Sequence, residues 1–164
     1  MRNIILIGMP GTGKSTVGVI LAKRLGYDFI DVDLLIIKKT GKTLPEIIAD
    51  DGVGGFLAIE NQVGESIRCD RCVIATGGSM VLNDRAMRHL GAESTVIWLD
   101  TDVAELEQRI ENGADRGIAM APGTTVAQIY ADRKGLYEKY ANIHIKCENG
   151  TDHVVSQIRD ALGL

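Results

Sequence analysis

The segment 8–15 constrains the fold of this chain most strongly, because its residues Gly-Met-Pro-Gly-Thr-Gly-Lys-Ser match the phosphate-binding pattern G-x4-G-K-[ST] in full. The apolar run 4–7 before it predicts a buried strand, and the apolar periodicity of 15–25 after it predicts a helix. In that context, backbone N–H groups surround phosphate oxygens at the positive end of a helix. The alternative is a glycine-rich turn without a ligand. We expect the chain to bind a nucleoside triphosphate.

Individual residues of this loop have distinct expected roles. Lys14 can reach the β- and γ-phosphates, and the hydroxyl of Ser15 can bind Mg²⁺. We therefore expect ATP as the phosphoryl donor and Mg²⁺ as the cofactor. The predicted ATP-binding residues of the loop are Gly11, Thr12, Gly13, Lys14, Ser15 and Thr16.

The length and charge of the chain limit the classes of protein to which it can belong. Its 164 residues are most simply one domain, 1–164, which is long enough to bury about two-thirds of its unfolded surface. A net charge of −4 argues against a broad nucleic-acid-binding surface. No apolar run reaches the roughly 18 residues that cross a membrane, and the first predicted strand starts at Asn3. We expect a cytoplasmic protein with no nucleic-acid or membrane partner.

Cys69 and Cys72 form a C-x-x-C motif. A structural zinc site needs a second pair of ligands, which the sequence lacks at the required spacing. A redox pair would normally stand at a helix N-terminus, whereas Cys72 leads into a predicted strand. We interpret both residues as ordinary thiols, and a redox pair is the alternative.

Apolar runs alternate with helical patterns along the whole chain, which is typical of a parallel sheet with crossover helices. The predicted strands are 4–7, 27–32, 72–75, 95–99 and 143–147. The predicted helices are 15–25, 45–50, 55–68, 84–90, 102–111, 125–140 and 152–162. Two segments exceed what a simple crossover requires, namely 33–68 and the glycine-rich 112–123. In a P-loop kinase the first would hold the acceptor and the second would be a lid that excludes water. The alternative is a pair of ordinary surface loops.

Polar or glycine residues follow two of the predicted strands. Asp31 and Asp33 are two residues apart, so both carboxylates project to one side of a strand end. One acid could support Mg²⁺ and the other could accept a hydrogen bond from an attacking hydroxyl; alternatively, Asp33 is a helix N-cap. Gly77 and Gly78 follow another strand, where a backbone without side chains lets a ligand approach closely. A turn without function is the alternative there.

Three arginines are candidates for anion binding. Arg116 is isolated in the glycine- and alanine-rich segment, so it could close onto the γ-phosphate and stabilise the transferred charge. Arg109 stands near the end of a predicted helix, where the helix dipole alone also favours an arginine. Arg133 lies on the predicted helix 125–140, and its alternative is a solvated residue among charged neighbours.

Several motifs occur in a fixed order along the chain. They are the phosphate loop, D-V-D at 31–33, D-G-x3-F-x2-I-E at 51–60, A-T-G-G at 75–78, R-x6-R at 109–116 and R-x2-L-Y at 133–137. Together they resemble the shikimate kinase family of small P-loop kinases, over essentially the whole chain. The combination is specific, because P-loop ATPases in general share only the first motif.

The resemblance implies a three-layer α/β P-loop kinase fold. It implies a five-stranded parallel sheet in the order 2-3-1-4-5, a helical substrate-binding insertion at 33–68 and a short lid at 112–123. The implied reaction is ATP-dependent phosphoryl transfer to a hydroxyl of a small metabolite, most simply from shikimate to shikimate 3-phosphate in aromatic amino-acid biosynthesis. We expect the protein to be a monomer.

The resemblance also implies roles on the nucleotide side of the site. Lys14 and Arg116 would be catalytic, because each would stabilise charge on the transferred phosphoryl group. Asp31 would stand with Ser15 on the metal side. Arg109 would lie against the adenine ring in a cation–π arrangement.

Four residues are implied on the acceptor side. Asp33 would contact the acceptor hydroxyl and serve as the catalytic base. Gly77 and Gly78 would offer backbone N–H groups to the acceptor. Arg133 would bind the acceptor carboxylate with a bidentate fork.

Leu57 is the main departure from the family pattern. It stands in the predicted substrate site, immediately after Phe56, where the family has a second carboxylate-binding arginine. Removing one partner of a buried charge pair typically costs about 2–5 kcal/mol. Either Arg133, Arg116 and a residue such as Lys134 hold the carboxylate, or the acceptor is another small polyol, sugar acid or amino-alcohol. A nucleotide-binding regulatory module is a further alternative.

Two milder departures accompany Leu57. Ser79 replaces a third glycine after the strand 72–75, although its backbone N–H remains available. Gly117 replaces the proline that usually follows the lid arginine, which should leave the lid less constrained.

Overall fold

Five parallel strands form one sheet in the computed structural model, which describes residues 2–112 and 118–164. The strands are β1 (Asn3–Ile7), β2 (Asp28–Asp31), β3 (Cys72–Ala75), β4 (Ser94–Asp100) and β5 (Ile143–Lys146). Their order is β2-β3-β1-β4-β5, which confirms the predicted topology. Each strand agrees with its predicted range to within one residue at either end.

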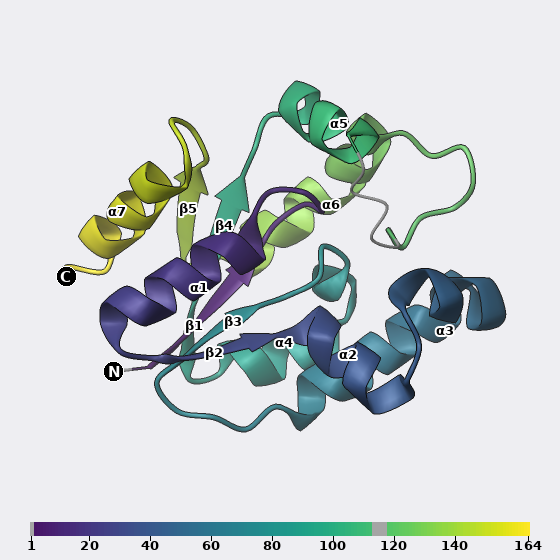
Figure 1. The fold of residues 1–164 in the computed structure, drawn as a ribbon, viewed down its shortest axis with the longest axis horizontal. Helices are drawn as coiled ribbons and strands as arrows, with labels where there is room; N and C mark the ends of the chain where they lie inside the picture. Colours follow the sequence, from purple (N-terminus) through teal and green to yellow (C-terminus); the bar gives the residue numbers. More distant parts are fainter. Residues whose placement is uncertain (1, 113–117) are drawn as a thin grey trace.

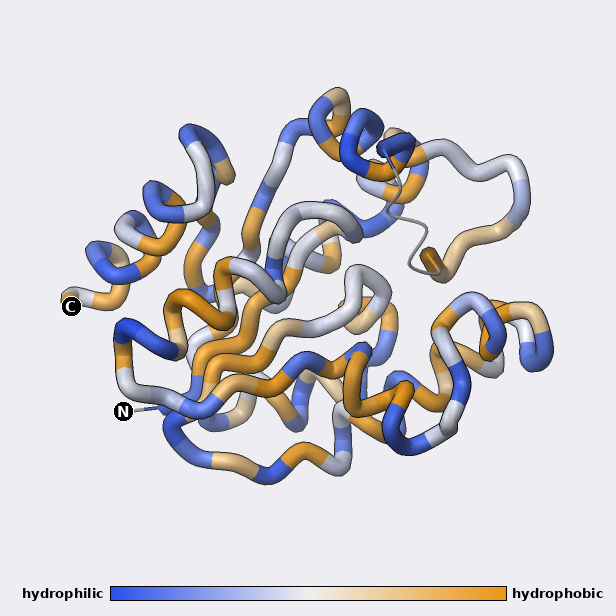
Figure 2. The backbone as a smooth tube through the Cα atoms, viewed as in Figure 1, coloured by the Kyte–Doolittle hydropathy of each residue, from blue (hydrophilic) through white to orange (hydrophobic). Residues whose placement is uncertain are grey.

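Helices cover both faces of this sheet, so the fold has the expected three layers (Figure 1). The helices are α1 (Lys14–Leu25), α2 (Val32–Thr40), α3 (Leu44–Ser66), α4 (Asp84–Gly91), α5 (Val103–Glu111), α6 (Val126–Tyr140) and α7 (Thr151–Ala161), with a short 3₁₀ helix at Met80–Leu82. Ile4 and Leu6 of β1 pack with α1 and α7, whereas Ile5 and Ile7 pack with α3, α4 and α6. Because both faces are covered, the inner strands are the most hydrophobic part of the chain (Figure 2).

The strand register brings the ends of four strands to one edge of the sheet. Ala75 of β3 is paired both with Leu6 of β1 and with Asp31 of β2. Ile7 of β1 is paired with Trp98 of β4. The segments that follow these residues therefore start side by side, as expected for ligand-binding loops at the carboxyl ends of parallel strands.

The insertion between β2 and β3 consists of α2 and α3. Helix α3 starts with a capping box, in which Thr43 and Glu46 each bond the backbone of the other. It breaks at Gly52, whose φ of 72° and ψ of 177° lie outside the helical region. This break separates the two predicted helices 45–50 and 55–68. The sequence patterns missed α2 as a helix in its own right.

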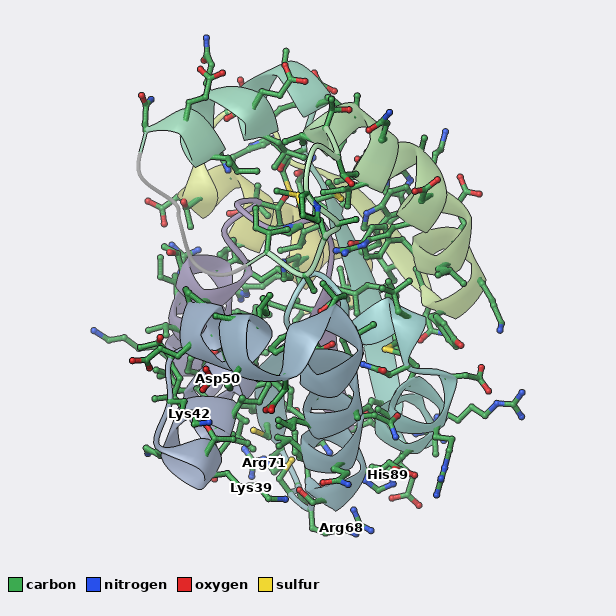
Figure 3. The ribbon with its side chains drawn as sticks, turned by 90° about the vertical axis from the view of Figure 1, so that its right-hand side faces the viewer. Lys39, Lys42, Asp50, Arg68, Arg71 and His89 are labelled. Carbon is green, nitrogen blue, oxygen red and sulfur yellow. The ribbon has the colours of Figure 1, made fainter. Side chains whose placement is uncertain are left out.

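Polar contacts hold α3 to its neighbours at both ends. The Lys42 ammonium, in the segment between α2 and α3, lies 2.9 Å from the carboxylate of Asp50, and the two side chains meet in Figure 3. At the other end, Arg68 Nη1 lies 2.7 Å from Nε2 of His89 on α4. The first contact lies within the insertion, and the second joins the segment after α3 to α4.

The three cysteines are free thiols. Burial raises the pKa of Cys72 to about 12 and also raises the pKa of Cys69, which disfavours the reactive thiolate. Within residues 2–112 and 118–164 there is no cluster of three His, Cys, Asp or Glu side chains that could hold a metal ion. No helix in the same ranges is long and apolar enough to cross a membrane.

Helices α3 and α4 pack closely at Gly64 of α3. A Cβ at Gly64 would lie 2.8 Å from Ala86 Cβ and 3.2 Å from the sulfur of Met80. We expect Gly64→Ala to lower the free energy of unfolding by about 1–3 kcal/mol through overpacking. Gly135→Ala is the matched control, because a Cβ there meets nothing within 4 Å. This control should raise stability by about 0.5–1 kcal/mol in urea unfolding. Equal effects of the two substitutions would contradict the close packing.

Candidate active site

The phosphate loop connects β1 to α1 and holds Lys14 in a buried position. Lys14 Nζ donates hydrogen bonds to the carbonyl oxygens of Gly8 and Met9, both at 2.8 Å. Burial lowers the pKa of Lys14 to about 8, although the nearby Asp33 carboxylate acts in the opposite direction. Thr12 is buried under the loop, where its hydroxyl contacts that of Thr101. A polyphosphate in the loop would favour the charged form of Lys14.

Asp31 links the phosphate loop to the start of α2. Its Oδ2 accepts a hydrogen bond of 2.6 Å from Ser15 Oγ, and its Oδ1 accepts hydrogen bonds from the backbone N–H groups of Asp33 and Leu34. Asp31 is therefore the N-cap of α2, and the alternative that gave this role to Asp33 is wrong. A hydroxyl and a carboxylate side by side form an oxygen-donor set that suits Mg²⁺.

One cavity of about 270 Å³ joins the phosphate loop to the predicted acceptor residues. The predicted site residues that line it are Gly11, Gly13, Lys14, Ser15, Thr16, Asp33, Gly77, Gly78, Arg109 and Arg133. Thr12 lines a second cavity instead, and Asp31 lines neither of the two. Leu57 is half-buried and packs against the core on α3, and the described residues that line the cavity do not include it. Arg116 and most of the predicted lid lie outside the described residues.

Two consecutive glycines after β3 form one wall of the cavity. A Cβ at Gly77 would lie 2.7 Å from Glu60 Oε2 and 3.0 Å from Asp33 Oδ1. A Cβ at Gly78 would lie 2.5 Å from Cδ of Pro10. The carbonyl of Gly78 accepts a 2.8 Å hydrogen bond from Tyr137 OH. No residue larger than glycine fits at either position without displacing the residues around it.

Arg133 reaches the cavity from α6 and is only 4% exposed, so the alternative of a solvated residue is wrong. Its Nη2 donates a 2.8 Å hydrogen bond to the carbonyl of Ala119. Its Nη1 is buried and has no hydrogen-bond partner among the described residues. A buried guanidinium with an unused donor is suited to bind an anion in the cavity.

Glu60 is a cavity residue that the sequence analysis did not assign to the site. It is 0% exposed, and its Oε1 accepts hydrogen bonds from Ser79 Oγ at 2.8 Å and Asn83 Nδ2 at 2.9 Å. Burial raises the pKa of Glu60 to about 7. The available signal was its position on α3, because Glu60 follows Phe56 by one turn and thus lies on the buried face.

A second cavity of about 290 Å³ lies on the other side of the phosphate loop. Gly13, Thr16 and Arg109 line both cavities, and the segment 147–151 after β5 closes the second one. Arg109 Nη1 donates a 3.0 Å hydrogen bond to the carbonyl of Gly11. No sequence motif indicated the segment 147–151, although its place after a parallel strand was a signal.

Chemically, the first cavity brings together two kinds of group. The loop and Lys14 can hold phosphate oxygens, while Asp33, Gly77 and Arg133 surround a space for a second molecule. A carboxylate beside that space can orient a hydroxyl toward the last phosphate. The arrangement is suited to phosphoryl transfer between two bound molecules.

Comparison with known proteins gives a consistent result. A family model described as "Shikimate kinase" matches residues 10–163. A shikimate kinase of Synechococcus elongatus is 38% identical over 160 residues, which cover 96% of this chain and 83% of that protein. A shikimate kinase 2 of Pectobacterium carotovorum subsp. carotovorum is 36% identical over 166 residues and 96% of its own length.

Solved structures show the same similarity. Shikimate kinase from Acinetobacter baumannii in complex with shikimate superimposes with a TM-score of 0.89 at 30% identity, over 99% of this chain and 94% of that one. Shikimate kinase from Aquifex aeolicus superimposes with a TM-score of 0.84 at 29% identity, over 98% of this chain and 96% of that one.

Proposed function

Because the chain belongs to the shikimate kinase family, we propose that it transfers the γ-phosphoryl group of ATP to the 3-hydroxyl of shikimate. The observation that carries this proposal is the single cavity that runs from Lys14 and Ser15 to Asp33, Gly77 and Arg133. It can hold a triphosphate tail and a small hydroxy acid next to each other. The product would be a shikimate phosphate for aromatic amino-acid biosynthesis.

In the proposed step, the acceptor hydroxyl oxygen attacks the γ-phosphorus, and the bond from that phosphorus to the bridging oxygen breaks as ADP leaves. Asp33 orients the hydroxyl and takes its proton. Lys14 and the loop N–H groups stabilise the charge on the phosphate oxygens. Arg116 stays a predicted catalytic residue that would approach the γ-phosphate from the lid.

Mg²⁺ fits the oxygen donors at the metal side of the loop. Ser15 Oγ and Asp31 Oδ2 are already 2.6 Å apart, so both would adjoin one cation, Ser15 as a ligand and Asp31 in support. When bound, the metal would neutralise charge on the β- and γ-phosphates.

The nucleotide base and the acceptor have separate places in this proposal. The adenine would occupy the second cavity beside Arg109 and the segment 147–151. Nη1 of Arg133, together with the backbone at Gly77 and Gly78, would bind the acceptor. One chain supplies all of these groups, so we propose that a monomer in the cytoplasm is sufficient for activity.

A coupled assay of ADP release tests the function directly. We expect purified protein with ATP and Mg²⁺ to release ADP only when shikimate is present, and shikimate 3-phosphate should accumulate. Nucleotide binding without shikimate-dependent ADP release would contradict the proposed function.

Lys14→Met tests the role of the buried ammonium. We expect kcat to fall by about 100- to 1,000-fold, because one preorganised charge donor is removed from the transition state. Lys23→Met is the matched control, since Lys23 is an exposed residue on the same helix. An unchanged kcat in Lys14→Met, or an equal loss in the control, would exclude the assigned role.

Leu57→Arg tests whether the missing arginine limits acceptor binding. We expect the KM for shikimate to fall, because a charge-assisted hydrogen bond contributes about 1.5–3 kcal/mol, which corresponds to roughly a tenfold to hundredfold change. The KM for ATP should not change, and Leu57→Met should behave like the natural protein. A shikimate KM that is the same in both variants would show that position 57 does not reach the acceptor.

A further inference from the structure

The carboxyl group of Glu60 is held in one orientation inside the active-site cavity. Its Oε1 accepts two hydrogen bonds, from the Ser79 hydroxyl and the Asn83 amide, and these occupy both of its lone pairs. Its Oε2 is buried and has no hydrogen-bond partner within the described ranges. A proton on Glu60 therefore belongs on Oε2.

The Oε2 atom lies where the acceptor would bind. It is 2.7 Å from the place of a Cβ on Gly77, on the same wall as Asp33 Oδ1 at 3.0 Å. Both Gly77 and Glu60 line the cavity with Arg133. A protonated Oε2 would thus present an O–H donor at the acceptor end of the cavity.

Charged groups from three elements act on Glu60. Asp33 on α2 disfavours its ionised form, whereas Arg133 on α6 and Lys14 on α1 favour it. The buried hydroxyl of Tyr137 on α6 donates to the Gly78 carbonyl, and the negative charge of Glu60 contributes to the raised pKa of Tyr137. Burial is the largest influence and favours the neutral acid, which gives a pKa of about 7.

The negative charge of the acceptor favours the neutral form of Glu60 over the ionised form. A hydroxy acid carries one negative charge, and Leu57 contributes no cation to balance it. With Asp33 and Glu60 both ionised, Arg133 and Lys14 would face three anionic groups once the acceptor is bound, besides the phosphates that Lys14 holds. A neutral Glu60 removes one of these charges and so allows the acceptor anion to bind Arg133.

We propose that Glu60 is an acceptor-binding residue that acts as a neutral carboxylic acid, with Ser79 and Asn83 as positioning residues that direct its proton to Oε2. When the acceptor binds, ionised Glu60 takes up one proton from solvent and donates it as a hydrogen bond to an acceptor oxygen. The proposal rests on the proposed function. It gives the side chain of Ser79, a residue that departs from the family pattern, the role of orienting the Glu60 carboxyl group.

The pH dependence of the shikimate KM tests this proposal. Because the neutral acid binds the acceptor, we expect this KM to be lowest at about pH 6 and to rise roughly tenfold for each pH unit above the pKa of Glu60. The shikimate carboxyl is fully ionised over this range and contributes no titration of its own. The KM for ATP is the internal reference.

Three variants separate Glu60 from other titrating groups. Glu60→Gln keeps a donor at the Oε2 position, so its shikimate KM should stay low and lose the rise with pH. Ser79→Ala removes a hydrogen bond that lowers the pKa of Glu60, so the rise should move to higher pH. Glu65→Gln, a carboxylate on the same helix, is the control and should match the natural protein.

A rise that persists in Glu60→Gln, or a natural protein whose shikimate KM does not change with pH, would overturn the proposal. Turnover of shikimate by the natural protein keeps these results distinct from a failure of the proposed function. If Glu60→Gln does not fold, calorimetry of shikimate binding to the natural protein in buffers of different ionisation enthalpy still tests the proposal, because it measures the number of protons taken up. Uptake of close to one proton at about pH 8 supports the proposal, and uptake of none overturns it.

Discussion

Parallel pairing of β1 with β3 and β4 is the constraint on which the site depends. The pairs Leu6–Ala75 and Ile7–Trp98 make the phosphate loop start level with the glycines after β3. The Thr76 hydroxyl fixes this register through a 2.9 Å hydrogen bond to the Leu6 carbonyl. A slip by one residue would exchange the two faces of β1 and separate the phosphate loop from the acceptor wall. The catalytic geometry is thus a consequence of the core.

Much of the fold could be predicted from local patterns, because buried strands and amphipathic helices leave a regular hydrophobic signal. The strand order could not be predicted in this way, because no local pattern identifies the neighbour of a strand. It was predicted from the family resemblance. Helix α2 was missed because Val32–Thr40 is short and starts directly at a strand end. The N-cap at Asp31 could not be told from one at Asp33, since both residues are aspartates on the same side of the chain.

The site was predictable where one segment carries the chemistry, as in the phosphate loop and the glycines after β3. Where the chemistry arises from packing, local sequence patterns were not enough, and only the family resemblance assigned Arg133 to the site. Arg133 stands among charged neighbours in the sequence, yet it is buried with an unused donor. Glu60 meets Ser79 and Asn83 only after α3 has folded against the 3₁₀ helix. The segment 147–151 carries no motif and gains its place from β5.

Leu57 and Ser79, which both depart from the family pattern, are connected through Glu60 in the acceptor site. Position 57 lies one helical turn before Glu60, so an arginine there would stand beside the carboxylate and favour its ionised form. With leucine at 57, the side chains that donate hydrogen bonds to Glu60 are a hydroxyl and an amide, which carry no charge. Such neighbours can hold a carboxyl group in either protonation state, whereas a guanidinium stabilises only the anion. The two substitutions therefore change the same property of the site, which is the charge that the acceptor meets next to Arg133.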